Sequence, residues 1–238
     1  TQVTDTPFHN TGLYNIGGTG NFPAGNQGLF EITERLADLG GAKWEVHALA
    51  KQMQAAGEPV IMLTIGEPDV ATPPALLTEA KRAMDAGRLG YSNGRGEPGL
   101  LSALAARYSA RTGRTISPQQ IACLPGTQTA LYAVLLTLTG PGDEVLVGDP
   151  LYATYEGLIA STGAVAVPVP LRAEHGFRMQ AADVAARVTP ETRVLFLNSP
   201  HNPTGAVLST DDLRALCAVA AEHDLWVLCD EVYEDMCF

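Results

Sequence analysis

The sequence is poor in lysine and acidic overall. Three of its 238 residues are lysines (Lys43, Lys51 and Lys81), and 15 Lys and Arg residues stand against 26 Asp and Glu residues, giving a net charge of −11. Proteins that bind nucleic acid or anionic membranes need a positively charged surface. The composition therefore argues against both kinds of partner.

Long apolar runs and cysteine pairs are also missing. No apolar run is long enough to span a bilayer, and no basic region followed by an apolar one opens the sequence, so no signal peptide is visible. The four cysteines form no CxxC pair, which is typical of free thiols in a reducing compartment. We therefore expect a cytoplasmic protein, and we predict no metal site.

Two kinds of glycine-rich nucleotide loop are excluded by their spacing. The chain has no GxxxxGK[ST] segment, and the glycine-rich residues 12–28 lack both a preceding strand and the GxGxxG spacing of dinucleotide sites. We expect residues 1–28 to form a flexible N-terminal arm instead.

Helices and short apolar strands alternate in the second half of the chain. The strands are apolar along their length rather than on alternate residues, which is typical of strands buried on both faces. We therefore predict an α/β fold with a mainly parallel sheet and helices on both faces. The predicted strands are residues 59–69, 121–126, 143–150, 164–171, 193–200 and 225–231, and the predicted helices are residues 29–56, 74–87, 96–113, 127–140, 151–163, 180–188 and 209–224.

Residues that follow the strands are candidates for ligand binding, because ligands of such sheets bind beyond the carboxyl ends of the strands. Gly126 and Thr127 lie where a strand leads into a helix, so backbone N–H groups and the positive helix end offer an anion site. A helix cap without a ligand is the alternative. Tyr152 and Tyr155 follow the next strand, where an aromatic ring either lies against a planar ligand or belongs to the core.

The last two strands end in further polar residues. Asn202 precedes Pro203, which disfavours helical backbone and directs the amide, although a simple Asx turn fits equally well. Asp230 ends the final strand, and Tyr233 follows three residues later. P-loop ATPases also place an acidic residue there, but their lysine loop is missing. An anion cradle, an aromatic ring, an amide and a carboxylate–tyrosine pair together predict a pocket for a flat, phosphorylated heteroaromatic ring.

Several segments carry a resemblance to a known family. In order along the chain they are "LTIGEPDVATPP", "GYSNGRGEPGLLSALAARY", "PGTQTAL", "PGDEVLVGDPLYATY", "NSPHNPTG" and "CDEVYED". Over about residues 31–238 the chain resembles the class I/II aminotransferases, which are fold-type I enzymes dependent on pyridoxal 5′-phosphate (PLP). Within this family, "GAKWEVH", "NSPHNPTGA" and "HDLWVLCDEVY" are most similar to arginine–pyruvate transaminases. The resemblance implies that residues 29–72 contribute to a small domain and residues 73–238 to an incomplete PLP-binding large domain.

The resemblance also implies roles for the residues that bind the cofactor ring. Asp230 would pair with the pyridine nitrogen and keep it protonated, so that the ring accepts electrons from the substrate Cα. Asn202 and Tyr233 would donate hydrogen bonds to the phenolic oxygen, and Tyr152 would stack on the ring. Asp230 and Tyr233 are thus the implied catalytic residues of this chain.

Further implied roles concern the phosphate, the substrate and the partner subunit. Gly126, Thr127 and Gln128 would hold the phosphate. Tyr91 would reach the phosphate of the other subunit, which implies a homodimer with shared active sites. Gly66, through its backbone, and Asn202 would contact the substrate.

The implied activity is the transfer of an amino group from an amino acid to a 2-oxo acid such as pyruvate, through pyridoxamine phosphate. The family's Schiff-base lysine lies downstream of the Asp-x-x-Tyr block, and the present sequence has no lysine after Lys81. We therefore expect the lysine, and an arginine that binds the substrate carboxylate, beyond Phe238 in a longer protein.

Two other functions fit the same cofactor residues. A PLP-dependent carbon–sulfur β-lyase would use the same residues for different chemistry. A catalytically silent PLP-binding domain, as in some transcription regulators, would follow a basic DNA-binding domain. That last reading is disfavoured because no Lys or Arg precedes Arg35.

Overall fold

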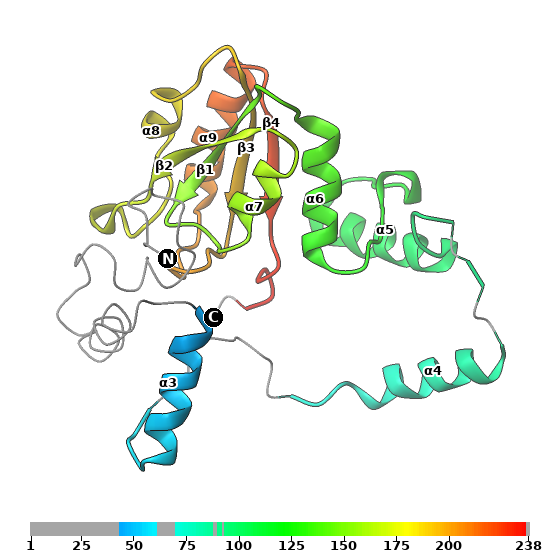
Figure 1. Ribbon diagram of the computed structural model, residues 1–238. Coiled ribbons are helices and arrows are strands. Elements are labelled where there is room, and N and C mark those ends of the chain that lie inside the picture. The colour runs from blue at the N-terminus through cyan, green and yellow to red at the C-terminus, as the bar shows by residue number, and fades with distance from the viewer. Residues whose placement is uncertain (1–42, 61–69, 88–89, 92, 237–238) are drawn as a thin grey trace. The chain divides into compact units, whose positions relative to one another are not determined.

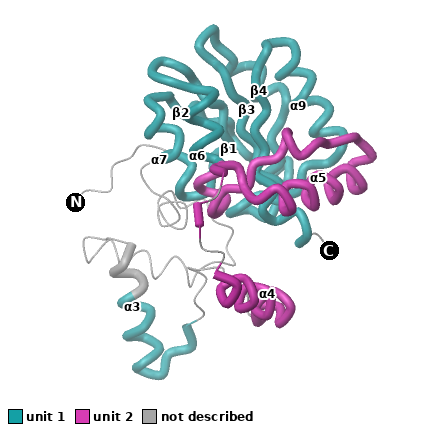
Figure 2. Tube along the Cα trace, turned by 90° about the vertical axis from the view of Figure 1, so that its right-hand side faces the viewer, with its two compact units in different colours: residues 1–60, 131–238 teal, residues 61–130 magenta. Residues whose placement is uncertain are grey.

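The computed structural model describes residues 43–60, 70–87, 90–91 and 93–236 (Figure 1). The chain divides into two compact units, one of residues 1–60 and 131–238 and the other of residues 61–130 (Figure 2). The predicted arm at residues 1–28 lies outside the described residues, as do most of the strand predicted at 59–69 and the start of the helix predicted at 29–56.

The first unit contains a four-stranded parallel sheet. Its strands are β1 (Glu144–Asp149), β2 (Val165–Pro170), β3 (Thr192–Asn198) and β4 (Trp226–Asp230), in the spatial order β2-β1-β3-β4. All three strand pairs are parallel, and the last pair of β3 and β4 joins Asn198 to Asp230. The prediction of a mainly parallel sheet in an α/β fold is confirmed.

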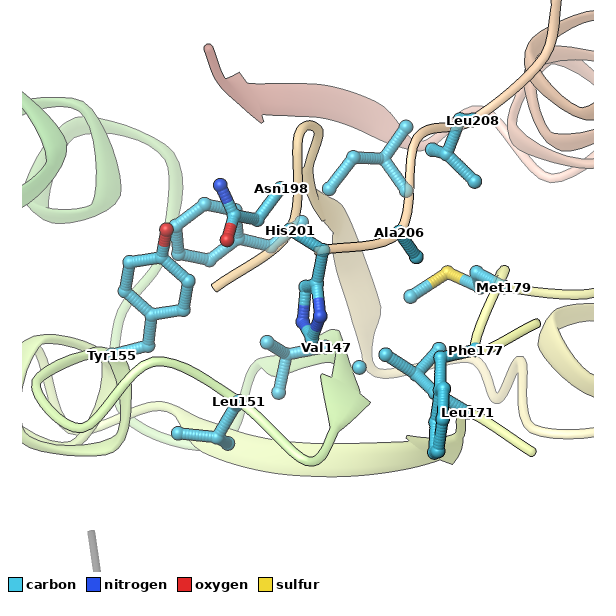
Figure 3. Close-up of a pocket in the computed structure, with 13 residues that line it drawn as sticks. Val147, Leu151, Tyr155, Leu171, Phe177, Met179, Asn198, His201, Ala206 and Leu208 are labelled. Atoms are coloured by element: carbon cyan, nitrogen blue, oxygen red, sulfur yellow. The ribbon is translucent and has the colours of Figure 1, made fainter. Parts of the chain in front are cut away.

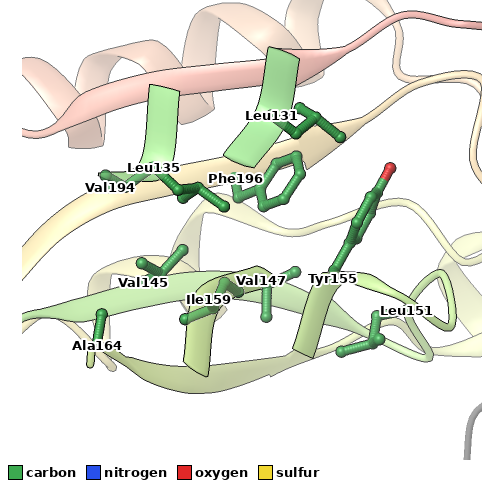
Figure 4. Close-up of a cluster of buried hydrophobic side chains, with 10 residues drawn as sticks. All are labelled: Leu131, Leu135, Val145, Val147, Leu151, Tyr155, Ile159, Ala164, Val194 and Phe196. Carbon is green, nitrogen blue, oxygen red and sulfur yellow. The ribbon is translucent and has the colours of Figure 1, made fainter. Parts of the chain in front are cut away.

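Both faces of this sheet are covered, as the apolar strands predicted. Alternate residues of β1 and β3 point to opposite sides, because side chains along a strand alternate between the two faces. One apolar cluster contains Leu131, Leu135, Val145, Val147, Leu151, Tyr155, Ile159, Ala164, Val194 and Phe196 (Figure 4). The other contains Leu146, Val169, Leu171, Met179, Val184, Leu195, Leu197, Leu216 and Ala220.

The helices begin and end close to the residues that local signals predicted. They are α3 (Lys43–Ala55), α4 (Pro74–Asp85), α5 (Pro98–Thr112), α6 (Thr127–Leu138), α7 (Tyr155–Ala160), α8 (Ala181–Ala185) and α9 (Thr210–Glu222), with short 3₁₀ turns η2 (Pro118–Gln120) and η3 (Ala173–His175). Ser209 caps α9 by accepting a hydrogen bond from the Asp212 N–H at 3.1 Å. Gly113 ends α5 with φ of 67°, a conformation that glycine adopts without steric cost.

The strand predicted at residues 121–126 is wrong. These residues belong to the second unit and form no strand. The Cys123 N–H donates instead to the Arg95 carbonyl at 2.7 Å, and the Arg95 guanidinium donates to the carbonyls of Gln119 at 2.7 Å and Ile121 at 3.0 Å. An arginine side chain therefore satisfies backbone groups that a neighbouring strand would otherwise have satisfied.

Helix α7 also differs from its prediction. It begins at Tyr155 rather than at residue 151, and residues 151–154 form a turn in which the Tyr155 N–H donates to the Tyr152 carbonyl at 3.0 Å.

None of the helices in the described part of the chain is long and apolar enough to cross a membrane.

Candidate functional site

The strand order creates a switch point at the carboxyl edge of the sheet. The chain passes from β1 to β2 on one side and then returns to the other side of β1 to form β3. The connections that leave β1 and β3 therefore diverge, and a crevice of this kind is the usual ligand site of an open α/β sheet. Tyr152 follows β1, Asn202 follows β3, Asp230 ends β4 and Tyr233 follows it.

Asp230 is a buried carboxylate with donors on both oxygens. The residue is 5% exposed to solvent. The Tyr155 hydroxyl donates to Oδ2 at 2.7 Å, and the Val232 N–H donates to Oδ1 at 3.0 Å. Among the described residues, no Lys, Arg or His forms an ion pair with it.

A buried carboxylate without a cation is energetically costly, because its charge has lost its water and gained no countercharge. Each carboxylate oxygen accepts more than one hydrogen bond, so Asp230 retains acceptor capacity beside its two donors. A protonated ring nitrogen would supply both a donor and the missing positive charge. The residue therefore fits the pyridine nitrogen of PLP.

Tyr155 connects Asp230 to the aromatic residues beside it. Its ring centroid lies 5.5 Å from that of Tyr152, at an interplanar angle of 74°, and 4.4 Å from that of Phe196. Burial, reinforced by the hydrogen bond to Asp230, raises the pKa of the Tyr155 hydroxyl above its usual value. The hydroxyl therefore remains a donor. The sequence offered Tyr155 beside Tyr152 as an aromatic candidate, but the family resemblance assigned a role at the ring to Tyr152 alone.

The loop after β3 is held against the end of β4. The amide of Asn198 donates to the backbone carbonyl of Asp230 at 3.1 Å, and its oxygen accepts from the Asn202 N–H at 2.8 Å. The Asn202 amide in turn donates to the Tyr233 hydroxyl at 3.4 Å. The structure thus brings Asn202 and Tyr233 together. It also adds Asn198, the last residue of β3, to which the sequence assigned no role.

His201 anchors the same loop from its other side. Its Nδ1 lies 2.7 Å from the Thr204 hydroxyl. Burial lowers the pKa of His201 to about 4, and a hydrogen bond to the Pro150 backbone opposes this shift only in part. His201 is therefore neutral at physiological pH, and we assign it a structural role.

A small pocket opens beside His201 (Figure 3). Its lining is mostly apolar and shares Tyr155 and Asn198 with the surroundings of Asp230, but it includes none of Tyr152, Asn202, Asp230 and Tyr233. The predicted cofactor residues of this unit therefore lie outside the pocket. Its full lining is Val147, Gly148, Leu151, Tyr155, Leu171, Phe177, Met179, Phe196, Leu197, Asn198, His201, Ala206 and Leu208.

The remaining candidates belong to the second unit or lie outside the described residues. Gly126 has φ of +90° and immediately precedes α6, whose first turn carries no acidic residue. Gly126 and Thr127 are exposed and Gln128 is half-buried, so this helix end suits an anion. Tyr91 is fully exposed. Gly66 lies in a segment that the structure does not describe.

Comparison with known proteins decides the family. The model of the family "Aminotransferase class I and II" matches residues 58–238. The chain belongs to this family. The match covers the sheet, its connections and the strand-end residues described above, and members of the family depend on PLP.

Individual aminotransferases agree with this assignment. Arginine–pyruvate transaminase AruH of Pseudomonas aeruginosa is 43% identical over 208 residues, covering 87% of this chain and 53% of that protein. A double mutant of the aspartate aminotransferase of Thermus thermophilus matches with a TM-score of 0.75 and 36% identity, over 82% of this chain and 51% of that one. The aspartate aminotransferase of Rhizobium meliloti matches with a TM-score of 0.77 and 32% identity, over 86% and 52%.

The resemblance seen in the motifs is therefore confirmed, both for the aminotransferase family and for the likeness to arginine–pyruvate transaminase. The chain spans about half the length of the curated relatives that it matches.

Proposed function

We propose that this protein is a PLP-dependent aminotransferase that moves an amino group from an amino acid to a 2-oxo acid such as pyruvate. One observation carries the proposal. In this member of the family, strand β4 ends at Asp230, whose buried carboxylate accepts two hydrogen bonds and has no cationic partner in the described structure. Pyruvate as acceptor is supported by the 43% identity to arginine–pyruvate transaminase AruH.

Asp230 would hold the ring nitrogen of PLP in its protonated form. When bound there, PLP supplies an electron sink for the substrate Cα. The Asp230 carboxylate contributes a fixed negative charge in a buried environment, where electrostatic interactions are stronger than in water. Its two hydrogen bonds restrict rotation of the carboxylate, so this charge is oriented before the cofactor binds.

The other cofactor residues would bind and orient different parts of the ring. Tyr152 would cover one face of it. Asn202 and Tyr233, which already lie 3.4 Å apart through the amide nitrogen and the hydroxyl, would direct donors to the phenolic oxygen. Asn202 would also contact the substrate, together with the backbone of Gly66.

The phosphate is assigned to the start of α6. Gly126, Thr127 and Gln128 would donate hydrogen bonds to its oxygens, with the positive end of the helix adding a favourable field. Tyr91 would contact the phosphate of a partner subunit, so we propose a homodimer. Its full exposure leaves the side chain accessible for such a contact.

The domain boundaries and the location of the protein remain proposals as well. We propose that residues 29–72 contribute to a small domain and residues 73–238 to the PLP-binding domain. A cytoplasmic location is supported by the unpaired thiols of Cys123, Cys217 and Cys229.

An amino-transfer assay on the full-length protein tests the function. The PLP-loaded protein is incubated with L-arginine or other amino acids and pyruvate, and alanine is quantified. Cystathionine without an oxo acid serves as the control for β-lyase chemistry, which would release pyruvate. Alanine formation supports the proposal. Pyruvate release from cystathionine without amino transfer to any oxo acid would overturn it.

A further inference from the structure

Tyr155 reaches Asp230 from a distant part of the sheet. Tyr155 begins α7, which follows β1, whereas Asp230 ends β4, and β3 lies between these two strands. The tyrosine ring crosses this distance by packing on Phe196 of β3, with ring centroids 4.4 Å apart. Its hydroxyl then donates to Asp230 Oδ2 at 2.7 Å.

The ring of Tyr155 has little freedom to leave this position. The residue is 2% exposed and belongs to the apolar cluster on this face of the sheet (Figure 4). Tyr152 contacts it edge-on and Phe196 contacts it from β3. Because protein interiors are closely packed, a ring enclosed in this way holds its hydroxyl at a defined place.

Two separate donors each hold one oxygen of the Asp230 carboxylate. The Val232 N–H comes from the segment that immediately follows Asp230 and holds Oδ1. Tyr155 holds Oδ2 from a separate element. A hydrogen bond weakens steeply as its donor angle falls, so a carboxylate must be aligned before it can accept a ring N–H well. Removing one of the two donors leaves the carboxylate free to turn.

We propose that Tyr155 is a positioning residue, which fixes the orientation of the Asp230 carboxylate toward the ring nitrogen of bound PLP and keeps Tyr152 beside it. The inference rests on the proposed function, because it assumes that Asp230 meets this nitrogen. Tyr155 would act through its hydrogen bond to Asp230 and its ring contact with Tyr152. The raised pKa of its hydroxyl is consistent with the role, since the donor is kept throughout the physiological range.

Tyr155→Phe is the variant that tests the role. Phenylalanine keeps the ring contacts with Tyr152 and Phe196 and removes only the hydroxyl. Thr162→Val is the matched control, because Thr162 also has a buried hydroxyl, which lies 3.0 Å from that of Thr139. Each variant therefore loses one buried hydrogen-bonding hydroxyl, but only Tyr155→Phe loses a donor to Asp230.

Three properties are measured on the full-length protein: the Kd for PLP, the ¹⁵N chemical shift of the ring nitrogen in bound ¹⁵N-labelled PLP, and kcat and KM for amino transfer. For Tyr155→Phe we expect PLP to bind about tenfold more weakly, which corresponds to one hydrogen bond to a charged group. We expect the nitrogen signal to move toward the unprotonated value, and kcat to fall about tenfold with KM for the amino donor within about threefold. Thr162→Val should leave all three unchanged.

Values for Tyr155→Phe within twofold of wild type in PLP affinity, nitrogen shift and kcat would overturn the inference, as would equal losses in Thr162→Val. If Tyr155→Phe does not fold, 3-fluorotyrosine placed at position 155 alone keeps the ring and makes the hydroxyl a stronger donor. The nitrogen signal should then move without a change in Tm, and an unmoved signal would count against the role.

The outcome for Tyr155 is separable from that for the proposed function. A wild-type protein that binds PLP but transfers no amino group overturns the function, while the affinity and the nitrogen shift still decide the role of Tyr155. A wild-type protein that does not bind PLP overturns both.

Discussion

Replacing Asp230 with asparagine removes one buried charge and changes almost nothing in size. Asp230 is 5% exposed, it accepts hydrogen bonds from Tyr155 and Val232, and it has no ion-pair partner within the described residues. The substitution therefore separates two effects of the carboxylate. One is its contribution to the fold without cofactor, and the other is its interaction with the protonated ring of PLP.

The change in fold stability should be small because two contributions oppose each other. Hydrogen bonds to a charged acceptor contribute about 1.5–3 kcal/mol each, and bonds to a neutral one about 0.5–1.5 kcal/mol. Asp230→Asn keeps one acceptor oxygen, so one bond goes to a neutral acceptor and the other loses its acceptor to an NH₂ group. The substitution also removes an unpaired buried charge, which costs several kcal/mol. We expect the free energy of unfolding of the cofactor-free protein to change by less than about 2 kcal/mol.

The loss of activity should be much larger. Removing one partner of a buried ion pair costs about 3–5 kcal/mol, and this converts to a decrease in kcat/KM of about 10²- to 10⁴-fold. The assay is a single-turnover reaction of PLP-loaded protein with an amino donor, followed by absorbance, together with urea unfolding of the cofactor-free protein.

Asp183→Asn is the control for charge removal, because Asp183 of α8 forms an ion pair with Arg172, which lies in the connection after β2. It should lower stability without lowering kcat/KM by more than about twofold. Activity of Asp230→Asn within tenfold of wild type would refute the reasoning, because the carboxylate would then not be the partner of the ring nitrogen.

Other predictions follow from packing and titration. His201 has a pKa of about 4 in the folded protein against 6.5 ordinarily, so the unfolded state binds more protons between these values and stability should fall as pH drops from about 6.5 to about 4. Urea titrations should show a flatter decline for His201→Gln, and equal slopes would contradict this. Gly148→Ala places a Cβ 2.9 Å from the Leu171 side chain and should lower stability by about 1–3 kcal/mol, whereas Gly157→Ala in α7 meets open space and should raise it by roughly 0.5–1 kcal/mol. Thermal unfolding distinguishes the two, and changes of the same sign would refute the argument. Ser209→Ala removes the cap of α9 and should cost about 1 kcal/mol, unlike Ser209→Asn, which retains a capping oxygen.

Local sequence signals were sufficient to predict where most of the described helices lie. Ser209 before α9 and Gly113 after α5 act on backbone groups within a few residues, so their effect can be recognised in a short window of sequence. The same holds for Asp230, which was recognised as the polar residue that ends an apolar strand. Its role toward the cofactor is a prediction that Asp230→Asn will test.

Residues 121–126 show where local signals fail. The segment is apolar and precedes a helix, but a strand requires a neighbouring strand in space. Here the Arg95 carbonyl accepts from the Cys123 N–H, and the Arg95 guanidinium donates to the Ile121 carbonyl. Local signals also do not show whether Tyr155 belongs to the candidate site or to the core. A tyrosine three residues after Tyr152 fits a core position equally well, and only its hydrogen bond distinguishes it.

The sequence by itself determined the class of fold, the family and the polar residues that follow the strands, because periodicity, caps and motifs are local along the chain. The tertiary structure decided the strand order β2-β1-β3-β4 and with it the switch point between β1 and β3. It also decided that Tyr155 and Asp230, 75 residues apart, share a hydrogen bond. Both depend on which strands pair across long separations, and pairing is set by the packing of the whole sheet rather than by any segment alone.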